Sequence, residues 1–190
     1  DLQYEAAGID PASIDTGALI LTGVAVRRSN ARAIGDLFAA QAGKFVSVSA
    51  GDGLETTLAA FGSGAAARSI RDASRVMNID IGGGTSKIAV CERGEVVDMT
   101  AIDIGARIIS FDHEGRITRL EEAGRRFAKE CGMDLELGAL ISEDQRAAMV
   151  ERMADRLFET ISQKTLGPET AGLLRLDALK NTRKPDSVTF

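Results

Sequence analysis

The chain has 190 residues, a formal net charge of −5 and an isoelectric point near 5.0, with 44% hydrophobic and 27% charged residues. This balance is ordinary for a globular protein and argues against a disordered chain. The acidic charge argues against electrostatic binding of nucleic acid. No apolar run reaches the length of a membrane span, and no basic and apolar leader opens the chain, so we expect no membrane partner and a cytoplasmic location.

The chain has two cysteines and one histidine, which narrows the chemistry further. Cys91 and Cys131 are 40 residues apart, a spacing that makes neither a disulfide framework nor a zinc knuckle, so both are predicted to be apolar packing residues. His113 lies in Asp-His-Glu-Gly, which predicts a solvated turn rather than a general base. A Ser-His-Asp enzyme or a multi-histidine metal site is therefore not expected.

The first part of the chain predicts alternating strands and helices. The expected elements are an irregular entry (1–16), a buried strand (17–23), a helix starting at Ser29 or Asn30 and ending near Ala42, a strand (45–50) and a helix (55–61) with Leu54, Leu58 and Phe61 on one side. This order predicts parallel pairing of the two strands.

The pattern changes to antiparallel hairpins near Ala73. The expected strands are 76–81, 86–92 and 95–102, followed by a smaller hairpin of 108–111 and 116–120 around His113. The rest of the chain predicts helices. The first helix is 121–131, ended by Gly132. A long helix follows, begun by a capping box of Ser142 and Gln145, and its apolar stripe is Met149, Val150, Met153, Leu157 and Ile161. A helix near 173–179 precedes a last strand at 188–190.

Two glycine-rich segments suggest binding sites. The first, Gly62-Ser63-Gly64-Ala65-Ala66-Ala67, fits the dinucleotide pattern G-x-G-x-x-A, but that fingerprint follows a strand and opens a helix. Here it follows the predicted helix 55–61, which favours the end of a helix over a nucleotide site.

The second segment runs from Asn78 to Val90 and joins two predicted strands through Gly82-Gly83-Gly84. Glycines allow the backbone to approach a ligand closely, and their amides can converge on phosphate oxygens. Thr85 and Ser86 add hydroxyl donors, while Asp80 is predicted to hold Mg²⁺. No Lys follows in the G-K-[ST] arrangement, which excludes a P-loop. The alternative is a glycine-rich hairpin turn, but three glycines exceed what such a turn needs, and Asp80 in an apolar strand demands a partner.

The segment Asp80-Ile81-Gly82-Gly83-Gly84-Thr85 resembles the second phosphate hairpin of the actin, sugar-kinase and heat-shock-chaperone ATPase superfamily. Nearly the whole chain is similar to the ethanolamine utilization protein EutA family, the reactivating factors of ethanolamine ammonia-lyase. The segments that carry this resemblance are Asp15 to Gly23, Asn30-Ala31, Ala50-Gly51, Leu54-Glu55, Gly62-Ser63-Gly64-Ala65 and Asp103-Ile104-Gly105 with Arg107.

The resemblance implies an α/β fold of ribonuclease H-like, actin-type ATPase lobes, with mixed sheets flanked by helices and ATP and Mg²⁺ in the cleft between two lobes. Residues 1–72 would be the second half of a first lobe. Residues 73–190 would be a second lobe with a helical insertion at about 112–180. Another phosphate hairpin and a Gly-Gly adenosine motif would flank the chain, so we expect an internal fragment that binds nucleotide weakly or not at all by itself.

The implied function is ATP-dependent, chaperone-like reactivation of an adenosylcobalamin-dependent ethanolamine ammonia-lyase by release of its damaged cofactor. The lyase is then the implied partner, association with a bacterial microcompartment is compatible with it, and a homo-oligomer stays open. Gly82, Gly83, Gly84, Thr85 and Ser86 would cradle phosphates, with Asp80 organising Mg²⁺. Two alternatives remain: a small-molecule kinase of the same superfamily, and an assembly module that does not hydrolyse ATP.

Several positions depart from the family pattern. Val24 stands where the family has an acid, and Ala106 where it has Gly. The family's Gly-Pro-Asp-Leu-Glu is Gly51-Asp52-Gly53-Leu54-Glu55 here. Related ATPases use an acid at this point to place the hydrolytic water, so Asp52, shifted by one position, and Glu55 are the candidates for that role. Lys87 replaces Asn, and strand alternation directs it away from the turn, which predicts a solvent-facing side chain.

Overall fold

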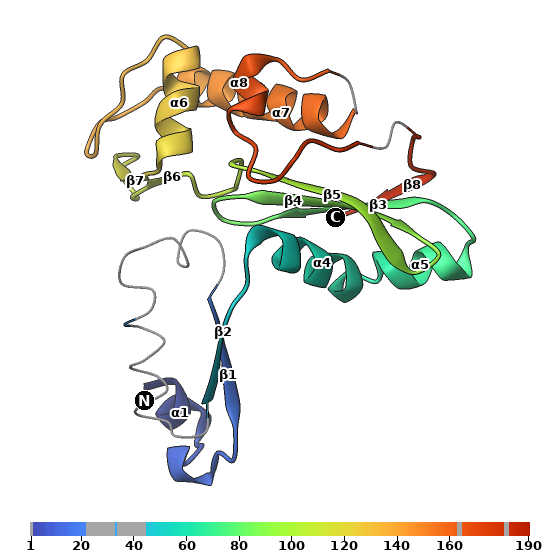
Figure 1. Cartoon of the computed structure of the whole chain (residues 1–190). Coiled ribbons are helices and arrows are strands. Elements are labelled where there is room, and N and C mark those ends of the chain that lie inside the picture. Colours follow the sequence, from blue (N-terminus) through green and yellow to red (C-terminus); the bar gives the residue numbers. More distant parts are fainter. Residues whose placement is uncertain (1, 22–32, 34–44, 163–164, 181–182) are drawn as a thin grey trace. The chain divides into compact units, whose positions relative to one another are not determined.

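The computed structural model describes residues 2–21, 33, 45–162, 165–180 and 183–190. They form two compact units, Asp1–Gly51 and Asp52–Phe190, and each is described by itself (Figure 1). The helix predicted from Ser29 or Asn30 to Ala42 lies outside the described residues. Among the described helices, none combines the length and apolar character needed to cross a membrane.

The first unit contains a pair of parallel strands, as the strand–helix–strand pattern predicts. Its elements are α1 (Leu2–Ala7), the short 3₁₀ helix η1 (Pro11–Ser13), β1 (Gly17–Leu21) and β2 (Phe45–Ser49). The register places Gly17 opposite Phe45. The two short helices were not predicted; η1 starts where the Asp10 side chain accepts a hydrogen bond from the Ala12 amide, which is an N-cap.

The second unit is built on a four-stranded mixed sheet. Its strands are β3 (Val76–Ile81), β4 (Ser86–Glu92), β5 (Glu95–Ile102) and β8 (Ser187–Thr189), in the order β5-β4-β3-β8. The β3–β4 and β4–β5 pairs are antiparallel, while β8 runs parallel to β3. The predicted hairpins and last strand, and the predicted class of a mixed sheet flanked by helices, are confirmed.

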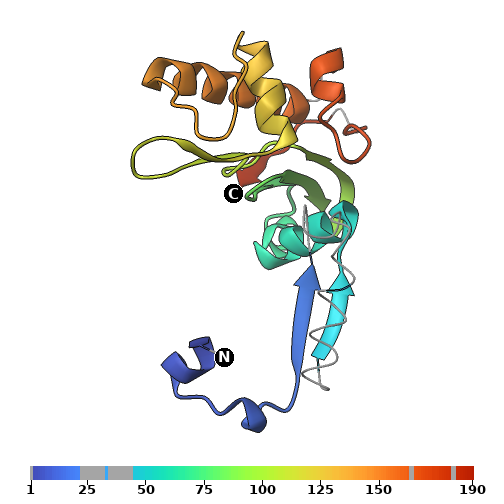
Figure 2. The ribbon, with the colours of Figure 1, turned by 90° about the vertical axis from the view of Figure 1, so that its left-hand side faces the viewer.

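Helices cover both faces of this sheet (Figures 1 and 2). One face carries α4 (Asp52–Gly62) and α5 (Ala65–Arg71). The other face carries α6 (Glu122–Glu130), α7 (Glu143–Ile161), α8 (Pro168–Ala171) and the small hairpin of β6 (Ile109–Phe111) and β7 (Ile117–Leu120). The helix α5 was not predicted; it begins after Gly64, whose left-handed φ of 80° separates it from α4.

The two faces have different cores. The α4–α5 face is packed with small side chains: Ala60, Ala65, Ala66, Val76, Ala89 and Cys91. The opposite face holds large ones, among them Met77, Ile79, Ile88, Ile102, Phe127 and Met149. A core of alanines lets helix and sheet backbones approach closely, which accounts for a chain with 7 Phe and no Trp.

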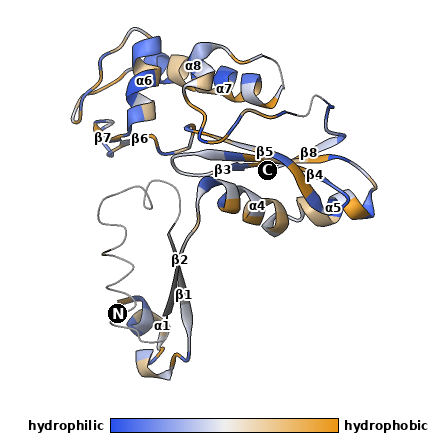
Figure 3. Cartoon of the chain, viewed as in Figure 1, coloured by the Kyte–Doolittle hydropathy of each residue, from blue (hydrophilic) through white to orange (hydrophobic). Residues whose placement is uncertain are grey.

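The apolar side of α4 lies away from the sheet. Leu54, Leu58 and Phe61 are about half exposed, and the buried residues of the helix are Thr56 and Ala60. The small and polar side of α4 packs inward because the strand facing it presents alanine and lysine rather than large apolar groups. In Figure 3, α4 has its blue residues at the start and pale to orange residues along the rest.

The C-terminal helices confirm part of the pattern and correct part of it. Ser142 and Gln145 form the predicted capping box of α7. Met149 is buried, but Val150 is 62% exposed and does not belong to the apolar stripe. The predicted helix 173–179 is wrong: the helix starts earlier, with Pro168 in its first turn, and ends at Ala171. A turn and an isolated bridge between Leu174 and Ile102 follow, and the Arg175 amide donates to the Ala101 carbonyl, 2.7 Å away.

The cysteines and the histidine lie as predicted. Cys91 is buried in the alanine-rich core and Cys131 is partly buried, both as free thiols. Burial raises the pKa of the Cys91 thiol, which keeps it protonated and unreactive. His113 is 91% exposed in the turn between β6 and β7.

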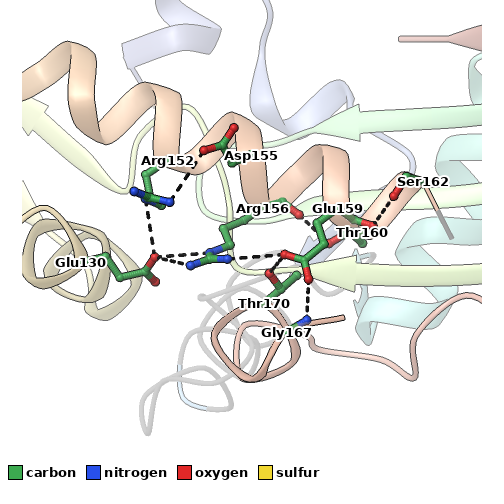
Figure 4. Close-up of polar contacts among 9 residues, drawn as sticks. All are labelled: Glu130, Arg152, Asp155, Arg156, Glu159, Thr160, Ser162, Gly167 and Thr170. Atoms are coloured by element: carbon green, nitrogen blue, oxygen red, sulfur yellow. Dashed lines mark hydrogen bonds and ion pairs between the residues drawn. The ribbon is translucent and has the colours of Figure 1, made fainter. Parts of the chain in front are cut away.

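A polar network ties α6, α7 and α8 together (Figure 4). Arg156 pairs with Glu130 of α6 at 2.8 Å and with Glu159 at 3.4 Å. Glu159 in turn accepts hydrogen bonds from the Thr170 hydroxyl and the Gly167 amide, so a carboxylate of α7 caps the start of α8. These two hydrogen bonds, followed by Arg156, lower the pKa of Glu159.

We predict that Glu159→Gln lowers the free energy of unfolding by about 1–2 kcal/mol at neutral pH, because the charged acceptor of these hydrogen bonds is lost. A carboxyl with a lowered folded pKa stabilises the fold above its unfolded pKa of about 4.3 and loses this contribution as the pH falls through the folded pKa. Urea unfolding should therefore show wild type and variant converging in acid. Glu151→Gln, on an exposed position of α7, is the control and should match wild type at every pH. A constant difference between wild type and Glu159→Gln would contradict the capping role.

Gly124 of α6 gives a second stability prediction, because the helix packs there directly on the small hairpin. A Cβ at Gly124 would lie 2.8 Å from Ile109 Cγ1 and 2.9 Å from the Ile108 carbonyl oxygen. Although alanine is the better helix former, Gly124→Ala should destabilise by about 1–3 kcal/mol through overpacking. The matched control is Gly53→Ala in α4, where the nearest atom is Met99 Sδ at 3.8 Å and stabilisation by about 0.5–1 kcal/mol is expected. Thermal unfolding of both variants measures the two changes in stability. Changes of the same sign in Gly124→Ala and Gly53→Ala would refute the packing argument.

Candidate functional site

The candidate site is the glycine turn that joins β3 and β4. The register pairs Ile81 with Ser86, and the Gly82 amide donates to the Thr85 carbonyl at 2.9 Å to close the turn. Asp80 and Lys87 form the next cross-strand pair, so both lie on one face of the sheet. The predicted strand–turn–strand geometry of this segment is confirmed.

The backbone that follows β5 clamps this turn. The Ala106 amide donates to the Gly82 carbonyl at 2.9 Å, and the Arg107 amide donates to the Gly83 carbonyl at 2.7 Å. A Cβ at Gly105 would lie 2.6 Å from the Gly83 carbonyl carbon and oxygen. Gly105 is thus required by close backbone contact, and the turn is held from both strands and from the segment behind it.

Two amides of the turn take no part in this clamp, although the Gly84 nitrogen lies against Gly105, 2.6 Å from the position of an added Cβ there. Within the described part of the chain, the amides of Gly83 and Gly84 have no protein acceptor. The Arg107 guanidinium lies beside the same glycine, with Nε 3.2 Å from the position of an added Cβ at Gly83. Two free amides and one cation at a glycine turn are the donor set that an anion binds.

The two hydroxyls predicted to contact phosphate are buried. Thr85 and Ser86 are almost inaccessible to solvent, and the Ser86 hydroxyl donates to the Ile104 carbonyl at 2.7 Å. In this structure Ser86 therefore fixes the clamp segment to β4. The contact of either hydroxyl with a phosphate stays a prediction.

Lys87 is not solvent-facing, which corrects the prediction from strand alternation. Its side chain is 4% exposed, and Nζ lies 2.6 Å from Glu55 Oε1 of α4. Alternation along β4 directs Lys87 to the face of the sheet that α4 covers. The ammonium is therefore buried between the sheet and the helix, and not exposed to solvent. The second Glu55 oxygen, Oε2, is buried without a hydrogen-bond partner among the described residues.

The other candidate acid, Asp52, lies at the start of α4 in a second ion pair. Arg175 is 3.7 Å from Asp52 and 3.6 Å from Asp103. The fold therefore brings Asp52, Glu55 and the glycine turn to the same end of the sheet. Arg175 was missed from the sequence, since it lies in a segment whose pattern predicted a helix and no motif marks it.

Asp80, the predicted magnesium ligand, is partly buried at the end of β3 and has no ion pair among the described residues. No cluster of three metal-ligating side chains occurs in the part of the chain that the structure describes. A magnesium ion here would take Asp80, water and nucleotide oxygens as ligands, a donor set that Mg²⁺ accepts.

Comparison with known proteins places the chain. The family model described as "Ethanolamine utilisation protein EutA" matches residues 1–190. The chain belongs to this family. It is 35% identical over 189 residues to the ethanolamine ammonia-lyase reactivase EutA of Escherichia coli and 36% identical to that of Salmonella typhimurium, covering 99% of this chain in both comparisons. It spans 40% of the length of these two relatives.

Solved structures of MreB 5 of Spiroplasma citri are more distantly similar to this EutA-family chain. The AMPPNP-bound structure has 17% identity and a TM-score of 0.34, covering 82% of this chain and 52% of the other. The ADP-bound structure has 16% identity and the same TM-score, covering 88% and 42%. Scores of this size do not by themselves establish a fold.

The Lys87–Glu55 pair gives a prediction for the site. Lys87→Met should destabilise the chain by about 3 kcal/mol, because Glu55 is left as a buried charge without a partner. The double variant Lys87→Met/Glu55→Leu should recover most of this loss, since two well-packed apolar side chains replace the pair. Chemical denaturation of wild type, both single variants and the double variant forms the cycle. Additive effects of the two single changes would show that the pair is not coupled.

Proposed function

We propose that this chain is part of an ATP-dependent reactivase that acts on ethanolamine ammonia-lyase and promotes release of its damaged cobalamin cofactor. The family supplies the role: both curated relatives are named as reactivases of this lyase. The observation that supports ATP dependence is the clamped glycine turn, in which the Gly83 and Gly84 amides have no protein acceptor among the described residues.

In this proposal Gly82, Gly83 and Gly84 lie against the phosphate chain, with Arg107 beside them. The clamp by the backbone of Gly105–Arg107 orients the free amides before any ligand arrives, so little reorganisation is needed on binding. Asp80 holds Mg²⁺, and the ion neutralises phosphate charge when it is bound. Thr85 and Ser86 support the turn and are the proposed hydroxyl donors, Ser86 by exchanging its hydrogen bond to the Ile104 carbonyl for one to phosphate.

The ion pairs refine the proposed roles of the acids. Asp52 is held by Arg175 and Glu55 by Lys87, so neither carboxylate is unpaired. Glu55 keeps one oxygen, Oε2, without a partner, and that oxygen is the proposed acceptor that orients the hydrolytic water. Asp52 then has a positioning role at the start of α4.

We also propose the two-lobed arrangement for the whole protein, with residues 1–72 in a first lobe and 73–190 in a second that includes a helical insertion at about 112–180. The helices α4 and α5 would then connect the lobes, since they pack on the sheet of the second unit. Nucleotide would bias two lobe arrangements and transmit this bias to the lyase. A cytoplasmic protein associated with a microcompartment fits this role.

The site assignment predicts the behaviour of Asp80→Asn in the intact protein. Loss of the carboxylate should lower ATP turnover by about 100-fold or more, because it removes the protein ligand of the metal. Asp134→Asn, at an exposed position before the α7 segment, is the matched control and should retain turnover. Phosphate release, nucleotide binding by calorimetry and recovery of inactivated lyase are measured on each protein.

Each outcome has a distinct meaning. Near wild-type turnover by Asp80→Asn would refute the magnesium assignment. Phosphorylated small molecule in place of free phosphate would favour the kinase alternative. ATP binding without turnover, even with lyase present, would favour the assembly module. Full lyase recovery without any nucleotide would refute ATP dependence itself.

A further inference from the structure

A polar cavity lies at the opposite end of the sheet from the glycine turn. It encloses about 290 Å³, and its lining includes Ser74, Arg75, Glu92, Arg93 and Arg183. These residues come from the start of β3, the end of β4 and the segment before β8. Because β3 has six residues at about 3.3 Å each, the cavity is roughly 20 Å from the turn and forms a separate site.

Arg75 belongs to this lining, but its side chain is 1% exposed, so the guanidinium lies beneath the surface of the cavity. Its Nη1 donates to Glu92 Oε1 at 2.6 Å. Its Nε and Nη2 have no hydrogen-bond partner among the described residues. Nε and Nη2 share one edge of the planar group, so the unpaired donors form a two-pronged fork of the kind that binds two oxygens of one anion.

The backbone of Arg75 is held in place, so this fork is not a mobile surface group. The Arg75 amide donates to Asp186 Oδ2 at 2.8 Å, and its carbonyl accepts from the Asp186 amide at 2.8 Å. A buried charged donor without a partner is unfavourable in a protein interior. Asp186 holds both the amide and the carbonyl of Arg75, which keeps the side chain in this position. The unpaired Nε and Nη2 therefore point to a ligand that supplies the missing acceptors.

The surroundings of the fork are cationic. Arg93 and Arg183 line the cavity with Arg75, and Glu92 is the single carboxylate in the lining, which gives a formal charge of +2; the Asp186 carboxylate on the Arg75 amide lowers the sum around Arg75 to +1. The Ser74 hydroxyl is also buried without a partner among the described residues. Arg183 is 66% exposed and lies 3.4 Å from Glu92 Oε1, the same oxygen that Arg75 contacts.

We propose that this cavity is a binding site for a small oxyanion, with phosphate as its preferred class. In this proposal the anion displaces the Arg183–Glu92 contact to reach the buried fork of Arg75, which takes two oxygens, while the Ser74 hydroxyl and the outer arginines take the others. A carboxylate shares the two-oxygen edge but offers no further oxygens, so it leaves Ser74 without a partner. The site therefore favours a tetrahedral anion, whether inorganic phosphate or a phosphate group on a small molecule.

Nuclear magnetic resonance of the ¹⁵N-labelled chain tests the site directly. Inorganic phosphate is titrated at constant ionic strength against chloride, with acetate and glycerol 3-phosphate as parallel arms. We expect phosphate to shift the Arg75 Nε–H signal and the amides of Ser74 and Arg93 in a saturable way, and acetate to do so more weakly. A response confined to Gly82–Ser86 would place phosphate at the glycine turn alone and overturn the proposal, without bearing on the reactivase role.

Two variants and a control localise the binding. Arg93→Gln/Arg183→Gln changes exposed side chains, so it should fold, and it should weaken phosphate binding by about tenfold or more through loss of charge-assisted contacts. Arg119→Gln, an exposed arginine of β7, is the control and should bind like wild type. Ser74→Ala should narrow the preference for phosphate over acetate. Unchanged affinity in the double variant, or equal shifts with acetate and phosphate, would refute a phosphate site.

Discussion

The direct backbone contact between Gly83 and Gly105 is the constraint on which the candidate site depends. A side chain on Gly105 would separate the turn from the segment behind it, since the space there is already filled by the Gly83 carbonyl and the Gly84 nitrogen. The contact brings two amides of one segment onto two carbonyls of the other. The carbonyls of Gly82 and Gly83 are then used, while the amides of Gly83 and Gly84 have no protein acceptor among the described residues. A flexible glycine loop becomes a fixed one by this arrangement.

The small side chains in the core beneath α4 also shape this end of the sheet. With alanines at the interface, the helix lies close enough to the sheet for Glu55 to reach Lys87. A core of larger side chains would lift α4 away and separate the two charges. The close packing and the buried ion pair are thus one feature, and together they set where the acids of α4 meet the end of β3.

The sequence predicted what depends on local pattern. Alternation and glycine spacing were enough for the β3–β4–β5 hairpins, and the Ser142–Gln145 spacing was enough for the start of α7. It failed where a distant element decides the environment. Lys87 alternates as expected, but only the position of α4 shows that its face is covered. The segment around Arg175 has helical spacing, yet it pairs with the Ala101 carbonyl instead. For the site, the turn was predictable, whereas the pairings of Asp52, Glu55 and Lys87 were not, because each joins residues far apart in the chain.

The pairing of β8 with β3 has a consequence for how this unit folds. Val76 lies opposite Ser187, so the fourth strand closes a loop of more than one hundred residues. The hairpins of β3, β4 and β5 involve neighbours and can form early, but this edge of β3 stays open until β8 has been made. During synthesis β3 therefore waits for this partner while α6, α7 and α8 are being made. A three-residue strand far from β3 in the sequence thus covers an edge that could otherwise pair with another chain.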